Sequence, residues 1–197
     1  MRILIVGAKG TIGSEIVKAL SANNEIVEAS RSHAHVKVDI RDAASIRSMY
    51  QKVGKVDAVV NAAGSGAWKP LTLLTDEDFE VSLHDKLMGQ VNLIRYGFDH
   101  LADHGSITVT SGILSRDPMQ GSAGSSLVNA GLEGFVRAAA MEAPRRIRVN
   151  VVSPPWVTET LEQMKMEGVP GLPAARVARA YALAVNGAQT GQVIEPA

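Results

Sequence analysis

Short apolar runs alternate along the chain with longer segments in which apolar residues recur every three or four positions. The runs are typical of buried strands, and the longer segments are typical of helices that bury one face. The predicted strands are 3–6, 25–29, 36–38, 56–60, 105–110, 147–152 and 192–195. The predicted helices are 12–20, 43–53, 76–101, 122–141, 158–166 and 174–186.

Strands that alternate with helices predict a parallel sheet joined by right-handed crossovers. We therefore expect an α/β fold of three layers, in which a mostly parallel, doubly wound sheet of seven strands has helices on both faces. The 197 residues suit a single domain over 1–197, because no repeat, low-complexity stretch or linker divides them. Ligands of such sheets bind at the carboxyl ends of the strands, where the strand order reverses.

Composition narrows the class of protein without identifying it. Hydrophobic residues make up 46% of the chain, enough for a buried core. No apolar stretch approaches the roughly 20 residues of a membrane span. The 20 basic residues balance the 20 acidic ones, so no field of one sign indicates a nucleic acid or a membrane as partner. There is no cysteine, and no further His or acid stands at a metal-site spacing from His84 and Asp85. We expect a soluble, cytoplasmic protein without a metal.

A glycine triplet with the spacing G-x-x-G-x-x-G directly follows the first predicted strand and opens the first predicted helix. Glycine permits positive φ and a close approach of the backbone to a ligand, and a helix start offers unpaired N–H groups. Together these features predict a seat for a pyrophosphate, although packing of a strand against a helix is an alternative reason for the glycines. The predicted phosphate-binding residues are Gly7, Lys9, Gly10, Thr11, Ile12 and Gly13.

Further segments stand at the ends of later strands, at matching intervals. They are Asp39-Ile40, Asn61-Ala62-Ala63-Gly64, Gly105-Ser106-Ile107 with Thr110-Ser111, Arg148 to Pro154, and Thr190 to Ile194. With the glycine turn, they make the chain resemble the short-chain dehydrogenase/reductase superfamily over essentially its whole length. The resemblance implies a Rossmann fold and a nicotinamide dinucleotide cofactor. The glycine spacing departs from the superfamily's commonest form, G-x-x-x-G-x-G.

The resemblance also implies individual cofactor contacts. Asp39 would bond the adenine amino group with the Ile40 backbone beside it, and Pro154 would lie near the nicotinamide. The segment along the adenine ribose would be Asn61, Ala62, Ala63 and Gly64. From the residues alone, Asp39 and Asn61 are equally well interpreted as caps of a helix and a turn.

The end of the second predicted strand indicates which dinucleotide is bound. NAD-binding folds usually place an acid there to bond the ribose 2′-hydroxyl, whereas this chain has Ser30, Arg31 and Ser32. The planar guanidinium of Arg31 suits a 2′-phosphate. We therefore expect NADP rather than NAD, with a solvated loop arginine as the alternative interpretation.

The catalytic positions depart from the superfamily's Asn-Ser-Tyr-Lys set. Alignment through 132–135 places Ser125 at the tyrosine and Asn129 at the lysine. Counting from the strand at 105–110 places Gly112 at the serine, directly after Ser111. No tyrosine of the chain stands in a Y-x-x-x-K pattern.

A lysine, Lys86, takes the place of the superfamily's asparagine. Lys86 is the predicted substitute cation, which would bind the ribose or donate a proton through water while Ser111 and Ser125 polarise a carbonyl. The alternative is a solvated lysine on a helix surface. Two functions therefore stay open: an NADP-dependent oxidoreductase acting on a small carbonyl or alcohol, and an NADP-binding sensor, regulator or assembly partner without turnover.

Two expectations concern the surroundings of the site. Only 156–173 lies between the sixth strand and the last helix, so the substrate is small or a second subunit closes the site. The helices at 76–101 and 122–141 correspond to those that pair in the superfamily's common dimer, which implies a homodimer or homotetramer. Trp68, Met119, Trp156 and Met164 are candidates for an apolar substrate pocket, with ordinary packing as the alternative.

Overall fold

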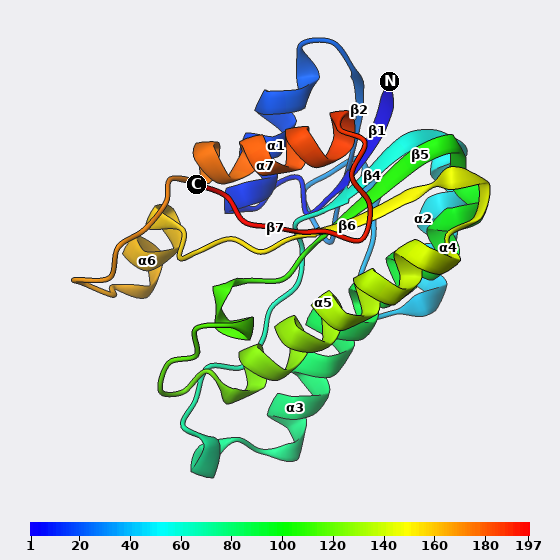
Figure 1. The fold of residues 1–197 in the computed structure, drawn as a ribbon. Coiled ribbons are helices and arrows are strands. Elements are labelled where there is room, and N and C mark those ends of the chain that lie inside the picture. The colour runs from blue at the N-terminus through cyan, green and yellow to red at the C-terminus, as the bar shows by residue number, and fades with distance from the viewer.

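The computed structural model describes residues 1–197 and has a single seven-stranded sheet (Figure 1). The strand order is β3-β2-β1-β4-β5-β6-β7, and every neighbouring pair is parallel. The strands are β1 (Arg2–Val6), β2 (Glu25–Ser30), β3 (Val36–Lys37), β4 (Val56–Asn61), β5 (Leu101–Thr110), β6 (Arg148–Val152) and β7 (Val193–Ile194).

Helices connect the strands and form the outer layers. The α-helices are α1 (Thr11–Ser21), α2 (Ala43–Val53), α3 (Asp76–Ser82), α4 (Gly89–Gly97), α5 (Ala123–Glu142), α6 (Thr158–Met164) and α7 (Ala174–Asn186). A π-helical turn joins α3 to α4 at Leu83–Met88. Short 3₁₀ turns lie at Leu71–Leu73, Phe98–His100, Ile113–Ser115 and Pro144–Arg146.

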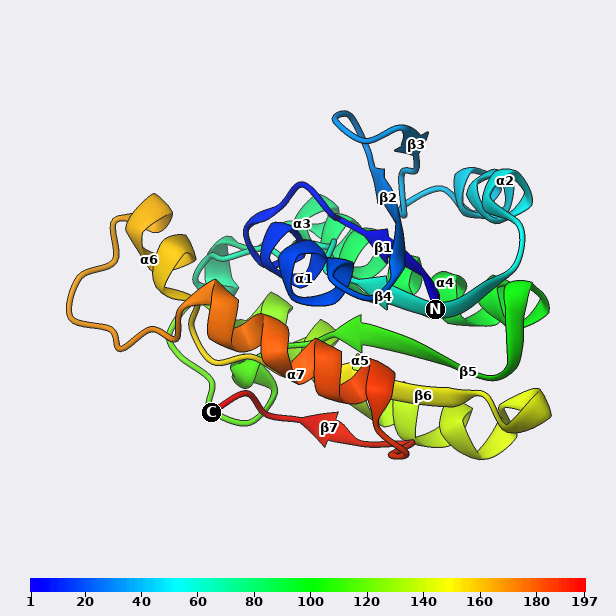
Figure 2. The ribbon, with the colours of Figure 1, turned by 90° about the horizontal axis from the view of Figure 1, so that it is seen from above.

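The core is divided by the sheet into two apolar layers. Helices α1 and α7 cover one face, and α2, α4 and α5 cover the other (Figure 2). Successive residues of a strand point to opposite faces, so in β1 Ile3 and Ile5 pack under α1 and α7 while Leu4 and Val6 pack on the opposite side. A strand covered on both faces reads as a continuous apolar run, which is why β1 was predicted without alternation.

The structure confirms the doubly wound α/β class, and the sheet is parallel throughout rather than mostly parallel. The predicted helix over 76–101 was wrong at its end. The helix gives way at Gly97 to a 3₁₀ turn, and Leu101 already belongs to β5, where it pairs with Val56. The polar Asp103 and His104 interrupt the apolar pattern there, and the register shifts beyond Val56, so the first half of β5 does not look like a strand in the sequence.

The strand order reverses between β1 and β4, which connect to opposite halves of the sheet. Their carboxyl ends, together with those of β5 and β6, open toward the end of the molecule where α3 and α6 lie (Figure 1). This edge is where a doubly wound sheet binds its ligand. None of the helices combines the length and apolar character needed to cross a membrane.

Candidate functional site

The glycine turn after β1 is tightly packed as well as open to a ligand. Gly7 has φ of 81°, and a Cβ added there would lie 2.7 Å from the backbone nitrogen of Ala63 at the end of β4. A Cβ at Gly13 would lie 2.0 Å from the Gly7 carbonyl oxygen. Helix α1 has no side-chain cap and no acid in its first turn, so its first N–H groups suit an anion. The structure therefore shows the packing reason for the glycines, and the uncapped start of α1 leaves room for the predicted phosphate contact.

A cavity of about 270 Å³ lies beside this turn, between the ends of β1, β2 and β4. It is lined by seven of the residues predicted to bind the cofactor: Gly7, Ser30, Arg31, Asp39, Ile40, Ala63 and Gly64. Arg41 donates to both carboxylate oxygens of Asp39, and this ion pair lowers the pKa of Asp39 below its ordinary value. The ion pair with Arg41 thus favours the ionised form of this carboxylate, which lines the cavity.

Some predicted cofactor residues point elsewhere. Lys9 forms an ion pair with Glu28 and lines a separate hollow. The hydroxyl of Ser32 lies 2.6 Å from a ring nitrogen of His33. The amide of Asn61 is fully buried and donates to the backbone of its own turn and to Gln90, so its side chain shapes the turn.

Three more of these residues belong to the packing around the glycine turn. Ile12 and Ala62 pack against the apolar layer beneath α1 and α7. The Thr11 hydroxyl accepts a hydrogen bond of 3.4 Å from Gln163 of α6, which connects the start of α1 to the segment after β6. These three residues therefore pack around the predicted phosphate-binding turn and support it.

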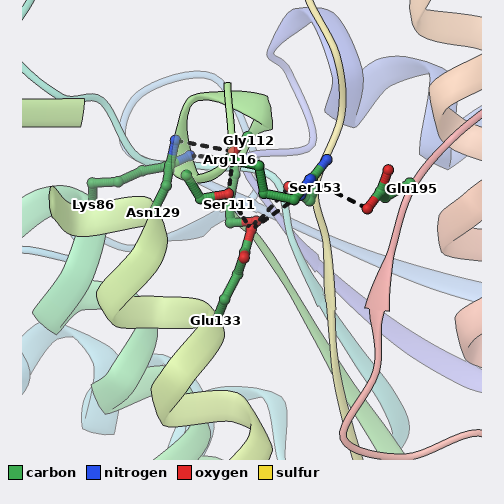
Figure 3. A network of polar contacts seen from close by, with 9 residues as sticks. Lys86, Ser111, Gly112, Arg116, Asn129, Glu133, Ser153 and Glu195 are labelled. Atoms are coloured by element: carbon green, nitrogen blue, oxygen red, sulfur yellow. Dashed lines mark hydrogen bonds and ion pairs between the residues drawn. The ribbon is translucent and has the colours of Figure 1, made fainter. Parts of the chain in front are cut away.

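A second cavity, of about 350 Å³, adjoins the first and shares Gly64 and Ser65 with it. It is lined by all three candidate catalytic residues, Lys86, Ser111 and Ser125, and by Pro154. Figure 3 shows Lys86 and Asn129 reaching from two different helices toward the same piece of backbone after β5. The two cavities therefore adjoin; we call the first the nucleotide groove, after the cofactor predicted to bind there, and the second the reactive cavity, after its candidate catalytic residues.

Lys86 is the only charged residue among those lining the second cavity. It lies in the π-helical turn between α3 and α4, and such widened turns frequently occur at functional sites. Its Nζ donates to the carbonyl oxygen of Ser111 at 3.3 Å. Burial lowers the pKa of Lys86 to about 8, against the opposing effect of the Asp85 carboxylate. Lys86 is therefore not a solvated surface lysine, and it can exchange a proton near neutral pH.

The hydroxyls of both candidate serines donate hydrogen bonds to other groups of the protein. The Ser111 hydroxyl donates to Glu133 at 2.8 Å, and the Ser125 hydroxyl donates to the carbonyl oxygen of Ala67 at 3.2 Å. A hydroxyl has one proton, and in this structure a protein acceptor holds each of the two, so the expectation that both polarise a substrate carbonyl stays a prediction that requires these hydrogen bonds to be exchanged. The backbone carbonyl oxygen of Ser111 accepts the hydrogen bond from Lys86.

Glu133 is a central residue that was not singled out from the sequence. This buried carboxylate of α5 accepts hydrogen bonds from Ser111, Ser115 and Ser153, and Arg116 lies 3.6 Å away (Figure 3). It thereby joins the ends of β5 and β6. The available signal was an acid four residues after Asn129, on a helix face that is otherwise apolar or small.

Asn129 leaves one polar atom unused. Its Nδ2 donates weakly to the Gly112 carbonyl oxygen at 3.4 Å, while its Oδ1 is buried without a partner. A buried acceptor without a partner costs free energy unless a ligand satisfies it. This unused acceptor, the glycine turn and the two joined cavities fit a nicotinamide dinucleotide. No group of three or more His, Asp or Glu side chains is arranged to hold a metal ion.

Comparisons with known proteins agree with this geometry. The family described as "Enoyl-(Acyl carrier protein) reductase" matches residues 11–191. The protein lin1944 from Listeria innocua is similar in structure, with a TM-score of 0.96, 44% identity, and coverage of 99% of this chain and 98% of that chain. A small-chain dehydrogenase solved in complex with NADPH has a TM-score of 0.88 and 26% identity, over 99% of this chain and 95% of that one.

A curated relative, hydroxynaphthalene reductase Arp2 of Aspergillus fumigatus, is 30% identical over 142 residues, which are 68% of this chain. The chain spans only 52% of the length of that relative. The family match over most of the chain, the strand order and the joined cavities all lead to one assignment. The chain belongs to the short-chain dehydrogenase/reductase superfamily.

Proposed function

We propose that the protein is an NADP(H)-dependent oxidoreductase acting on a small carbonyl compound or alcohol, with Lys86 as its proton donor and acceptor. The observation that carries the proposal is a lysine with a pKa of about 8 in the wall of the cavity that adjoins the nucleotide groove. The family match and the reductase names of its relatives support the reaction class.

The nicotinamide, when bound, supplies or accepts the hydride. During reduction, Lys86 in its ammonium form donates a proton to the substrate oxygen and becomes a neutral amine, which water reprotonates. In the reverse direction the neutral amine takes the proton from the alcohol. Ser111 orients the ammonium through its carbonyl oxygen, and Glu133 holds Ser111 in place. Asn129 Oδ1 offers an acceptor to a cofactor or substrate hydroxyl.

Turnover of Lys86→Gln tests this function directly. General acid catalysis contributes about 10²–10⁴-fold, so we expect NADPH oxidation with a panel of ketones to fall by that factor. The wild-type rate of reduction should decline as the pH rises through about 8, because the ammonium form is lost, and the variant should lack this limb. Lys52→Gln, at an exposed lysine of α2, is the matched control and should match the wild type. Equal rates for Lys86→Gln and the wild type would refute the role of Lys86.

The proposed preference for NADP rests on Arg31, which lines the nucleotide groove beside Ser30. No acid stands at the end of β2 itself, and the Asp39 and Asp85 carboxylates of the same cavity come from other segments. The relative solved with NADPH supports the same assignment for this chain. The proposed contact is a charge-assisted pair between the Arg31 guanidinium and the phosphate.

One observation favours a second function, an NADP(H)-binding protein without turnover. Both serine protons at the site are held by protein acceptors, so Lys86 would act without a hydroxyl partner. Fluorescence titration of NADPH, run beside the turnover panel, separates the two functions. Tight NADPH binding with no consumption against any carbonyl would favour the second.

A further inference from the structure

We propose that the reactive cavity takes a flat, uncharged aromatic carbonyl compound, whose ring packs against Trp68 and Trp156. This assigns a substrate class to the proposed function and rests on it for the fate of the carbonyl group. The binding part stands on the walls of the cavity alone.

The two tryptophan rings form an aromatic corner in the cavity wall. Their centroids lie 5.4 Å apart at an interplanar angle of 73°, an edge-to-face arrangement. Trp68 comes from the segment after β4 and Trp156 from the segment after β6, and both are partly buried cavity-lining residues. Rings that stay partly exposed inside a cavity offer π surface to a ligand, and aromatic partners prefer such edge and offset contacts.

The backbone on either side holds this corner in place. The residue before Trp68, Ala67, donates to the Ser82 hydroxyl at 2.9 Å and accepts from Ser125 at 3.2 Å. The carbonyl oxygen of Trp156 accepts from Leu172 at 2.8 Å, which ties the two ends of the short segment after β6 together. The corner is therefore largely formed before a ligand arrives, and a preformed site loses less free energy on ordering.

The distribution of polarity along the cavity defines the ligand further. Its lining combines Lys86 and Asn129, whose Oδ1 has no partner, with the apolar side chains of Trp156, Val157 and Met164. No arginine or second lysine lines the cavity to neutralise a carboxylate or phosphate on the substrate body. A ligand with one carbonyl oxygen and an uncharged apolar body matches this pattern.

Size restricts the body of the ligand. The cavity of about 350 Å³ is near the lower limit of small-molecule sites, roughly 300–1,000 Å³, and it has to admit the reacting ring of the cofactor as well. Room is left for a compact body of one or two fused rings. Trp156 and Pro155 also line a neighbouring hollow of about 560 Å³ beside 168–172, through which such a body can enter.

The composition of the chain makes binding measurable, because Trp68 and Trp156 are its 2 tryptophans. Intrinsic fluorescence therefore reports on this cavity. We would titrate the full chain, with and without NADP⁺, with 2-tetralone as the flat aromatic ketone, 2-decalone as its saturated analogue and pyruvate as the anionic one. We expect saturable quenching by 2-tetralone, at least tenfold weaker binding of 2-decalone and no binding of pyruvate.

Variants assign the binding to the rings. Trp68→Leu and Trp156→Leu should each weaken 2-tetralone binding by about tenfold, the free-energy range of one aromatic contact, whereas Trp156→Phe should bind nearly as the wild type does. Equilibrium dialysis measures the affinity of every variant for 2-tetralone, because each tryptophan variant lacks one of the two fluorescent side chains. Circular dichroism verifies that the variants fold. Undetectable binding of 2-tetralone, pyruvate binding that matches it, or unchanged affinity in both Leu variants would overturn the inference.

NADPH consumption in the presence of 2-tetralone is scored separately. Ring-dependent binding of 2-tetralone, with no NADPH consumption by it or by any ketone of the panel, would retain the binding inference and refute the proposed oxidoreductase. Consumption of pyruvate that is insensitive to both Leu variants would retain the oxidoreductase and refute the substrate class.

Discussion

Replacing Glu133 tests whether the buried polar network holds the site together. The carboxylate receives three serine hydroxyls, at 2.7–2.9 Å, from the segments that follow β5 and β6. Glu133→Leu has a similar volume but no acceptor, so it leaves three hydroxyls without their partner. Glu133→Gln keeps the shape and one amide oxygen in place of the charged acceptor.

The size of the effect follows from this geometry. Each of the three hydroxyls that loses its acceptor costs about 1–3 kcal/mol, and the cost is smaller where the hydroxyl has another acceptor, as Ser115 has in the Gly112 carbonyl oxygen at 3.0 Å. We therefore expect Glu133→Leu to lose about 3–5 kcal/mol of unfolding free energy. Glu133→Gln should lose about 1–2 kcal/mol, because a neutral acceptor makes hydrogen bonds roughly half as strong as a carboxylate does.

Urea unfolding followed by circular dichroism at pH 7 measures these losses. For a chain of this length, each kcal/mol lowers Tm by about 2–4 °C, so Glu133→Leu should melt at least 6 °C below the wild type by that relation. Glu142→Leu, at an exposed glutamate at the end of the same helix, is the matched control and should differ by less than about 0.5 kcal/mol.

A double-mutant cycle with Ser153→Ala isolates the network from general packing. Ser153 donates to Glu133 and accepts from Arg116. Its removal should cost measurably less in the Glu133→Leu background than in the wild type, with a coupling of about 1 kcal/mol. Additive losses, or a Glu133→Leu variant as stable as the wild type, would refute the network as a stabilising unit.

Three further predictions concern the cofactor turn, the nucleotide preference and assembly. Arg31→Ala should weaken NADPH binding about 10–100-fold, which corresponds to the loss of one charged hydrogen-bonded pair. The affinity for NADH should stay unchanged. Fluorescence titration measures both affinities, and tighter binding of NADH than of NADPH by the wild type would contradict the prediction. Gly13→Ala should destabilise the protein by at least about 1–3 kcal/mol, because its Cβ meets the Gly7 carbonyl oxygen. Gly134→Ala, where no atom lies within 4 Å of the added Cβ, should instead stabilise helix α5, and equal melting temperatures would refute the packing argument. We expect a homodimer in light scattering at micromolar concentration, converted to monomer by Leu127→Glu at an exposed position of α5; a monomeric wild type would refute it.

The fold was predictable because its signals are local. Most elements can be identified from residues that are close in the sequence. The signals are continuous apolar runs, a glycine turn at the end of the first strand and helical spacing of apolar residues. The start of β5 was missed because Leu101 pairs with Val56, a contact between residues far apart in the sequence. The π-helical turn around Lys86 likewise leaves no periodic signature over so few residues.

The positions of the predicted cofactor residues could be inferred from the sequence, whereas the directions of their side chains could not. Sequence spacing brings Gly7, Arg31 and Asp39 to one cavity, because strand ends converge at the reversal of strand order. Sequence spacing does not reveal the direction of a side chain that can form a hydrogen bond or an ion pair with a neighbour in the fold. Lys9 pairs with Glu28 and Asn61 binds its own turn, and both contacts depend on three-dimensional neighbours.

The chemistry of the reactive cavity depends on where protons are already held. The sequence suggested three donors, whereas the structure commits the Ser111 proton to Glu133 and the Ser125 proton to a backbone carbonyl. Lys86 is then the one side chain of the wall with a proton of suitable acidity, and burial is what lowers its pKa toward the working range. If the proposed reaction occurs, its proton transfer depends on Lys86. Two features position this side chain: the π-helical turn that carries Lys86, and the Glu133 network, which fixes the Ser111 carbonyl oxygen that Lys86 contacts. Disturbing the Glu133 network should therefore alter the pH dependence of turnover before it alters nucleotide binding, because Glu133 binds serines that follow β5 and β6, whereas the first cavity lies at the ends of β1, β2 and β4.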